Sequence, residues 1–313
     1  MSHKSKTRPN FFIVGAPRCG TTALHTYLSD HDQVVMSSPK EPNYFATNFP
    51  TQRYVTDDPS YLSLFRDVDE NSKAIGEASA WYLYSREAID NIREFNANAK
   101  IIVMVRNPIS LLPSIHKMLQ INFAEDQEDL ETAWKLQADR QNGRNLPKGR
   151  NQKFDVSTLQ YREVCRLGEQ VQHLFTQFPP SQIKAILFDD FITDTKNVYC
   201  QTLDFLGIAQ DGRSEFPQVN SARNYKSKWL GWSIWKLRDI GSAVKSKLGI
   251  TRSFAIQQKL NSLNKKPVPR QTLSKEFIEH LQLEFREDIL LLQEVLGVSL
   301  ADWLAKPASA DQI

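Results

Sequence analysis

The sequence predicts an α/β fold of three layers, in which a central parallel sheet is flanked by helices. Short apolar runs alternate with longer segments of helical periodicity, and this alternation is typical of parallel sheets. The run 101–105 is continuously apolar, as expected of a strand that is buried on both faces. A glycine-bounded loop, 15–20, joins the first apolar run to the first helix. Strand, loop and helix in this order form a phosphate cradle, so the predicted fold is P-loop-type.

The predicted elements follow one another in regular order. Proline is favourable in a first helical turn, so Pro108 predicts a helix start just after the strand 101–105. Glycine after a helical pattern predicts its end, as at Gly207 and Gly297. The predicted strands are 11–14, 73–76, 101–105 and 183–188, and the predicted helices are 21–29, 84–95, 108–119, 158–178, 195–206 and a long final helix capped by Ser274.

Length and composition favour one globular domain. The chain has 313 residues, of which 41% are hydrophobic and 24% are charged, and these are ordinary values for a globular protein. We expect a disordered N-terminal tail over 1–10, a single domain over 11–304 and a C-terminal tail over 305–313. Within the domain, the polar segment 124–153 is expected to be a mobile insertion with some helix near 130–138.

The cysteines and the lengths of the apolar segments indicate in which cellular compartment the protein is expected. Cys19, Cys165 and Cys200 are odd in number and widely spaced, which suggests neither a disulfide framework nor a zinc site. The first apolar run is far too short for a signal peptide or a membrane span, and no other segment approaches about 18 apolar residues. We therefore expect a reduced protein with a cytoplasmic location.

The loop 15–20 departs from the nucleoside-triphosphatase pattern at one decisive position. Gly15 and Gly20 have the spacing of G-x-x-x-x-G-K-[ST], but Thr21 stands where that pattern has its lysine. The basic residue is Arg18, which precedes the second glycine. The loop is therefore predicted to bind a phosphate-like group, but not to hold ATP in the usual way.

Two further predicted strands end in polar groups that a reaction could use. Glu77 follows the strand 73–76, and Arg106 follows the strand 101–105. In open parallel sheets, ligands bind at the carboxyl ends of the strands. If these strands are neighbours of the first one, the loop, a carboxylate and an arginine share one cleft.

Six short motifs follow one another along the chain: 17–22 (PRCGTT), 39–45 (PKEPNYF), 76–79 (GEAS), 106–108 (RNP) with Ser114, 187–191 (LFDDF) and 300–303 (LADW). Their order and spacing resemble the sulfotransferases that use 3′-phosphoadenosine 5′-phosphosulfate (PAPS). The resemblance covers roughly residues 11–304 and is closest to the branch of the heparan sulfate sulfotransferases and their bacterial relatives.

The resemblance implies a role for each candidate site residue. Lys40 would stabilise the charge that develops on the leaving phosphate, and Glu77 would be the general base that removes the acceptor proton. PAPS has no γ-phosphate for a triphosphatase lysine to reach, and the family needs no metal. The implied donor-binding residues are Arg18, Cys19, Gly20, Thr21 and Thr22 for the 5′-phosphosulfate, and Arg106 and Ser114 for the 3′-phosphate.

The resemblance also implies the kind of acceptor. A glutamate base is typical of the carbohydrate-acting branch, so we expect transfer to a hydroxyl or amine of a carbohydrate or glycolipid, with adenosine 3′,5′-bisphosphate as the product and no nucleic-acid partner. Alternatives are a non-carbohydrate small-molecule alcohol as acceptor, a P-loop kinase and a non-catalytic binding protein. Structural roles are the competing interpretations of single residues: a surface salt bridge for Arg106, a solvated lysine for Lys40 and an arginine partner for Glu77.

The tract 223–270 is strongly basic and carries tryptophans. It has twelve Lys and Arg residues against one acidic residue, Asp239. One interpretation is a solvated helix whose tryptophans pack on the core; the other is a surface for an anionic acceptor polymer or, peripherally, a membrane. The residues of interest are Arg223 and Lys226, which could reach the 3′-phosphate, and Trp229, Trp232 and Trp235, which recur at a spacing of three.

Overall fold

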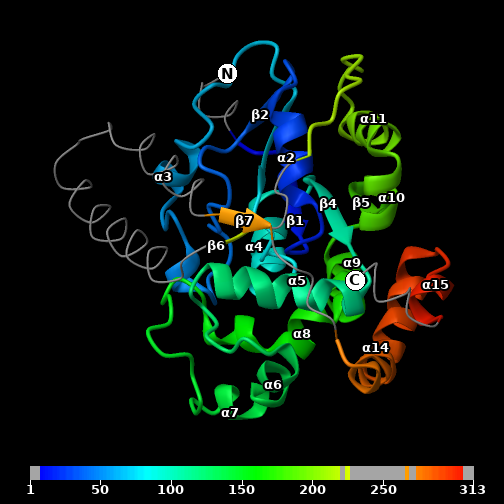
Figure 1. Cartoon of the computed structure of the whole chain (residues 1–313). Helices are drawn as coiled ribbons and strands as arrows, with labels where there is room; N and C mark the ends of the chain where they lie inside the picture. The colour runs from blue at the N-terminus through cyan, green and yellow to red at the C-terminus, as the bar shows by residue number, and fades with distance from the viewer. Residues whose placement is uncertain (1–7, 219–222, 226–264, 268–272, 306–313) are drawn as a thin grey trace.

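The centre of the molecule is a five-stranded parallel sheet with the strand order β2-β3-β1-β4-β5 (Figure 1). The structure is a computed structural model, and it describes residues 8–218, 223–225, 265–267 and 273–305. The strands are β1 (Phe11–Gly15), β2 (Val34–Met36), β3 (Ala74–Ala78), β4 (Lys100–Val105) and β5 (Ile183–Leu187), and a separate antiparallel pair is formed by β6 (Arg223–Tyr225) and β7 (Lys265–Pro267).

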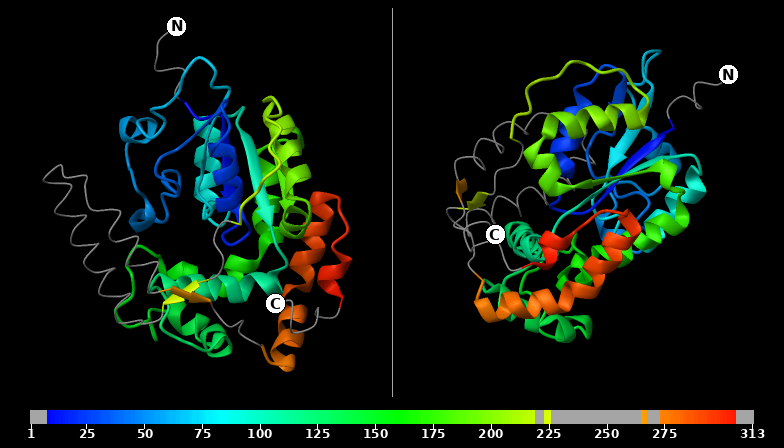
Figure 2. Two further views of the ribbon diagram at one scale, coloured as in Figure 1. Left: turned by 45° about the horizontal axis from the view of Figure 1, so that its top comes forward. Right: turned by 90° about the vertical axis from the view of Figure 1, so that its right-hand side faces the viewer.

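Helices cover both faces of the sheet, which confirms the predicted three layers. α2 and α11 lie on one face, and α9 and α14 lie on the other (Figure 2). The helices are α2 (Thr21–Ser29), α3 (Asp58–Leu62), α4 (Arg86–Phe95), α5 (Pro108–Ile121), α6 (Leu130–Lys135), α7 (Gln137–Gln141), α8 (Tyr161–Cys165), α9 (Leu167–Gln177), α10 (Phe188–Thr193), α11 (Thr195–Leu206), α14 (Lys275–Leu296) and α15 (Ala301–Leu304), with short 3₁₀ turns η1 (Pro50–Gln52), η2 (Val156–Leu159) and η3 (Pro180–Gln182).

The first strand lies at the middle of the sheet, between β3 and β4. Phe11 is paired with Gly76 of β3 on one side and with Lys100 of β4 on the other. Every residue of β1 and of β3 is buried, as the near-continuous apolar character of these strands requires. The predicted shared cleft requires the strands near Glu77 and Arg106 to be neighbours of the first strand. The structure meets this requirement, because β3 and β4 both flank β1, which ends in the loop.

The segment 158–178 was expected to form one amphipathic helix, and this prediction is wrong. The structure has η2, α8 and α9 in its place. The break before α9 is stabilised from outside, because the Asp288 carboxylate on α14 accepts the backbone N–H groups of Gly168 (2.9 Å) and Glu169 (3.0 Å). A helix start needs partners for its first N–H groups. The apolar period runs across the break, so periodicity alone does not reveal it.

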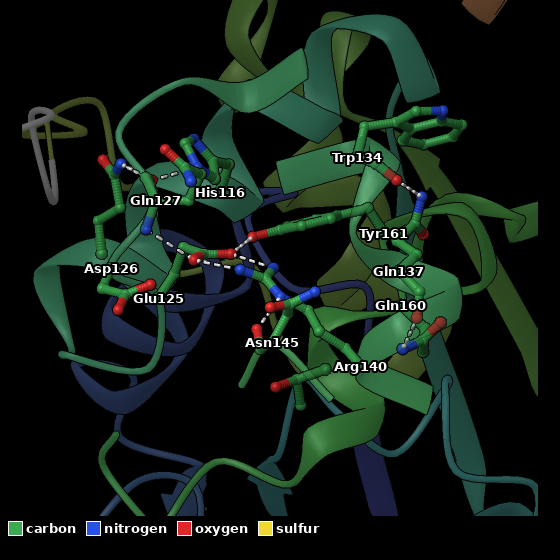
Figure 3. A network of polar contacts seen from close by, with 12 residues as sticks. His116, Glu125, Asp126, Gln127, Trp134, Gln137, Arg140, Asn145, Gln160 and Tyr161 are labelled. Carbon is green, nitrogen blue, oxygen red and sulfur yellow. Dashed lines mark hydrogen bonds and ion pairs between the residues drawn. The ribbon is translucent and has the colours of Figure 1, made fainter. Parts of the chain in front are cut away.

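The polar segment 124–153 contains α6 and α7, which confirms helix near 130–138. That this insertion is mobile stays a prediction, but the segment has an anchor in the form of a buried ion pair. Arg140 donates to both carboxylate oxygens of Glu125 at 2.5 and 2.8 Å, and the two side chains are 1% and 0% exposed (Figure 3). The sequence gives no sign that two charges in a polar stretch pair with each other beneath the surface.

The first described residues belong to the fold and not to a loose tail. The Asn10 side-chain amide donates to the Lys73 carbonyl (2.9 Å), and its oxygen accepts the Ile75 N–H (2.9 Å). Residue 10 of the predicted tail over 1–10 is therefore tied to the fold, and residues 1–7 of that prediction lie outside the described residues.

Most of the basic tract 223–270 lies outside the described residues, and so do its tryptophans. Its predicted roles therefore stay predictions. Among the helices that the structure describes, none has the length and apolar character needed to cross a membrane.

Candidate functional site

The loop after β1 has the geometry of an anion cradle. Gly15 has φ +151°, and a Cβ there would lie 2.7 Å from the Ala80 carbonyl oxygen and 2.8 Å from Leu83 Cβ. Gly20 has φ +93° and caps α2 in the left-handed conformation, which favours glycine. Within the described part of the chain, no side chain caps this helix. Its Ala23 and Leu24 N–H groups donate to the Gly20 carbonyl at 2.9 and 3.2 Å, so among the described residues the N–H groups of Thr21 and Thr22 are the ones open to an anion.

Arg18 points from this loop toward α5. Its Nε donates to Ser114 Oγ at 3.0 Å. Burial lowers the pKa of Arg18, and the neighbouring Glu41 carboxylate opposes this shift; the guanidinium keeps its proton in either case. The sequence assigned Arg18 and Ser114 to opposite ends of the donor. The structure joins them, so one contact links the phosphosulfate loop to the predicted 3′-phosphate site.

Arg106 is held by a serine that the sequence did not single out. Its Nε donates to Ser110 Oγ at 3.0 Å, and its guanidinium carbon lies 4.7 Å from the centre of the Phe188 ring. Ser110 and Ser114 are four residues apart on α5, so they share one face of the helix. That face therefore orients both arginines, Arg106 through Ser110 and Arg18 through Ser114.

Cys19 lies near both arginines, but its thiol is unreactive. Its side chain has no exposed surface. Burial raises the pKa of the Cys19 thiol to about 12, although Arg106 and Arg18 both act in the opposite direction. The thiol therefore stays protonated, and the Cys19 N–H donates to the Ala16 carbonyl at 3.3 Å; the predicted role of Cys19 in donor binding stays a prediction.

Lys40 lies beside the end of β3. Its Nζ forms an ion pair with Glu41 Oε1 at 2.6 Å, and the Lys40 side chain is 18% exposed. The Glu41 N–H donates to the carbonyl of Ala78, the residue after Glu77, at 3.2 Å. Lys40 is thus neither fully solvated nor remote from Glu77, and its positive charge acts on the Glu77 carboxylate.

Glu77 has no exposed surface and is bound by hydroxyl groups. Its Oε1 accepts from Tyr61 (2.7 Å) and Tyr82 (3.0 Å), and its Oε2 accepts from Ser79 (2.9 Å). Burial raises the pKa of Glu77 to about 7, and the three hydroxyls and Lys40 oppose the rise. The alternative of an arginine partner is wrong. An acceptor can touch this carboxylate only after covering side chains move.

One histidine, not predicted to belong to the site, stands near Lys40. Burial, and after it the Lys40 charge, lower the pKa of His25 on α2 to about 4. His25 is therefore neutral around pH 7. Within the described ranges, no group of three His, Cys, Asp or Glu side chains could hold a metal ion.

These features define an α/β protein whose loop after β1 has the geometry of an anion cradle, with a carboxylate and three cations near that loop. The sulfotransferase domain family matches residues 8–247, and the chain belongs to this family.

Curated relatives match parts of the chain. The chain is 31% identical to human carbohydrate sulfotransferase 15 over 34% of this chain and 26% of that protein. It is 34% identical to the membrane-associated sulfotransferase kil1 of Dictyostelium discoideum over 32% of this chain and 21% of that protein. It is 23% identical to the human bifunctional heparan sulfate N-deacetylase/N-sulfotransferase 3 over 64% and 22%, respectively. The chain thus spans about a fifth to a quarter of the length of these relatives.

A solved structure supports the fold over nearly the whole chain. A sulfotransferase from Alicyclobacillus acidocaldarius aligns with a TM-score of 0.69 and 23% sequence identity, covering 95% of this chain and 99% of that one.

Proposed function

We propose that the protein transfers a sulfuryl group from PAPS to a hydroxyl or amine of a carbohydrate or glycolipid. The observation that carries this proposal is one cluster beside the carboxyl ends of β1, β3 and β4. It joins the anion loop, Arg18 and Arg106 on their serines, and Lys40 beside Glu77.

Each part of the cluster has a task in donor binding. The loop from Arg18 to Thr22 holds the 5′-phosphosulfate through backbone N–H groups and the Arg18 charge. Arg106 and Ser114 hold the 3′-phosphate, and Ser110 orients Arg106. The arginine pair adds the charge that a doubly phosphorylated nucleotide requires.

The reaction balances with these residues alone. The acceptor oxygen or nitrogen bonds to sulfur while the bond from sulfur to the bridging phosphate oxygen breaks. The acceptor proton passes to the Glu77 carboxylate, and Lys40 stabilises the charge on the departing phosphate. The products are the sulfated acceptor and adenosine 3′,5′-bisphosphate.

The carbohydrate acceptor is supported by the glutamate base and by the names of the relatives, which include carbohydrate and heparan sulfate sulfotransferases. A small-molecule alcohol is the second candidate acceptor. A cytoplasmic location, and contact of the tract 223–270 with an acceptor polymer or a membrane surface, remain part of the proposal. Incubating the full chain with labelled PAPS and a panel of acceptors, with products identified by mass spectrometry, distinguishes the acceptor classes.

Arg106 offers a sharp test of the donor. Loss of one hydrogen-bonded charge costs about 1.5–3 kcal/mol, so Arg106→Ala should weaken adenosine 3′,5′-bisphosphate binding about 10- to 100-fold while ADP binding changes little. Calorimetric titration measures both ligands. Arg144→Ala is the matched control, because Arg144 pairs with Asp139 on the surface of the segment 124–153. Equal losses for the two nucleotides would contradict the 3′-phosphate assignment, and a larger thermal shift with ATP and Mg²⁺ than with the bisphosphate would favour a kinase.

A further inference from the structure

The Glu77 carboxylate is enclosed by hydroxyls from two separate parts of the chain. Tyr61 comes from α3, which Asp57 caps by accepting the Ser60 N–H. Ser79 and Tyr82 come from the turn after β3. All three side chains are fully buried, and together they fill three acceptor positions on the two oxygens of Glu77.

The direction of two of these hydrogen bonds is fixed by backbone groups. The Asn43 N–H donates to Ser79 Oγ at 3.1 Å, and the Phe45 N–H donates to the Tyr82 hydroxyl at 3.2 Å. A backbone N–H can only donate. Each hydroxyl accepts from the backbone and has its own proton free for Glu77, to which it donates, as suits an ionised carboxylate.

The same two hydroxyls connect Glu77 to the segment that carries Lys40. Asn43 and Phe45 follow Lys40 by three and five residues. A hydroxyl relay thus runs from each of these N–H groups to one oxygen of Glu77. The distance between the candidate base and the candidate cation is set by this relay as well as by the Glu41 backbone contact.

We propose that Tyr61, Ser79 and Tyr82 are positioning residues that favour the ionised form of Glu77 and fix the carboxylate relative to Lys40. This inference rests on the proposed function, because it assigns the hydroxyls to the general base of that reaction. In the described part of the chain no N–H donates to the Tyr61 hydroxyl, so this hydroxyl can rotate and accept a hydrogen bond from Glu77 when the carboxyl is protonated in each turnover.

The charges around Glu77 agree with this assignment. Lys40, Tyr61 and Tyr82 are the titratable groups that act on it from the neighbouring segments. Burial alone disfavours the ionised carboxylate, and the hydroxyls counter that effect. Without these hydroxyl hydrogen-bond donors, Glu77 would keep its proton at neutral pH and could not act as a base.

Tyr61→Phe is the discriminating variant. It removes the donor but keeps the ring, which stacks on Tyr44 at 4.3 Å between centroids. A hydrogen bond to a charged group is worth about one to two pKa units. The acid limb of kcat/KM should therefore move up by that amount, and activity at pH 7 should fall about 5- to 50-fold, as the ionised fraction of Glu77 falls. Binding of adenosine 3′,5′-bisphosphate should stay unchanged. Tyr84→Phe is the matched control, because the Tyr84 hydroxyl donates to the Ser157 carbonyl (3.1 Å) and not to Glu77.

A second readout does not depend on turnover. Carbon-13 NMR of labelled glutamate carboxyls gives the Glu77 titration directly, with Glu77→Gln identifying the signal. An upward shift of the Glu77 midpoint in Tyr61→Phe, absent in Tyr84→Phe, supports the inference. An unchanged midpoint overturns it, even if the enzyme transfers sulfuryl groups. If the wild-type protein transfers none, the proposed function fails while the titration still decides the role of the hydroxyls.

Discussion

Among the residues that the structure describes, two glutamates are buried, Glu77 and Glu125, and the hydrogen-bond donors around them differ. Glu125 accepts two hydrogen bonds from Arg140, one from the Tyr161 hydroxyl (2.6 Å) and one from the Gln127 N–H (2.8 Å), as Figure 3 shows. In the described ranges, the donors to Glu77 are all neutral hydroxyls. Burial acts to raise the pKa of Glu125, but the donors outweigh it and the pKa of Glu125 is lowered. For Glu77 burial prevails, and the pKa rises to about 7.

The difference separates a structural carboxylate from one that can move a proton. A carboxylate held by a guanidinium stays ionised throughout the neutral range and ties two segments together. A carboxylate held by hydroxyls gains and loses its proton near neutral pH, as a general base requires. We therefore expect changes around Glu125 to lower the stability of the protein, and changes around Glu77 to lower its activity.

The largest effect is expected for Glu77→Gln. Removing a general base costs about 10²- to 10⁴-fold in rate, while the donor-binding groups remain in place. Turnover should fall by that factor, and the dissociation constant for adenosine 3′,5′-bisphosphate should stay within about twofold. Steady-state kinetics and calorimetry measure the two quantities. A loss of nucleotide binding would instead give Glu77 a structural role.

Arg140→Met should act on stability. It leaves the Glu125 carboxylate buried without its cation, and breaking a buried pair in this way costs about 3–5 kcal/mol. Urea unfolding at pH 7 measures the loss. The control Arg144→Met, which removes an exposed partner of Asp139, should cost less than about 1 kcal/mol. Equal losses in the two variants would mean that the Glu125 pair is not the anchor of its segment.

The contributions of the two glutamates to the free energy of unfolding should change with pH in opposite directions. The folded pKa of Glu77 is raised from 4.5 to about 7, so its contribution is fully present below about pH 4.5 and is lost as pH rises through 7. The loss amounts to about 3 kcal/mol. The folded pKa of Glu125 is lowered, so its contribution is present above about pH 4.5 and is lost in acid. Unfolding of each Gln variant beside wild type, from pH 4 to 9, tests both signs.

Tyr161→Phe should have the smallest effect. It removes one donor from Glu125, which keeps both Arg140 contacts, and a lost bond to a charged group costs about 1.5–3 kcal/mol. The activity per folded molecule and the acid limb of the kcat/KM pH profile should not change, whereas Tyr61→Phe should change both. A displaced acid limb in Tyr161→Phe would show that the two buried networks are coupled.

The sheet was largely predictable because its strands carry local signals. β1, β3, β4 and β5 are apolar runs that polar or glycine-rich segments bound, and their order along the chain predicted a parallel sheet. β2 was missed because Val34–Met36 is too short for a pattern. The division between α8 and α9 was missed because its cause, Asp288, lies far away in the sequence.

The site was predictable to the extent that strand ends and motif spacing define it. Arg18, Lys40, Glu77 and Arg106 were found in this way. The partners Tyr61, Ser110 and Phe188 were missed, because each meets its charge only through tertiary packing. The Ser110 contact had a weak signal, since it lies four residues after Arg106.

The central claim is that Glu77, unlike Glu125, exchanges its proton near neutral pH. Carbon-13 NMR titration of both carboxyl groups in the wild-type chain tests it most directly, with the two Gln variants identifying the signals. The expected result is a Glu77 midpoint near 7 and a Glu125 midpoint below its ordinary value. Two midpoints that lie together near 4 would contradict the account, because Glu77 would then be one more structural carboxylate.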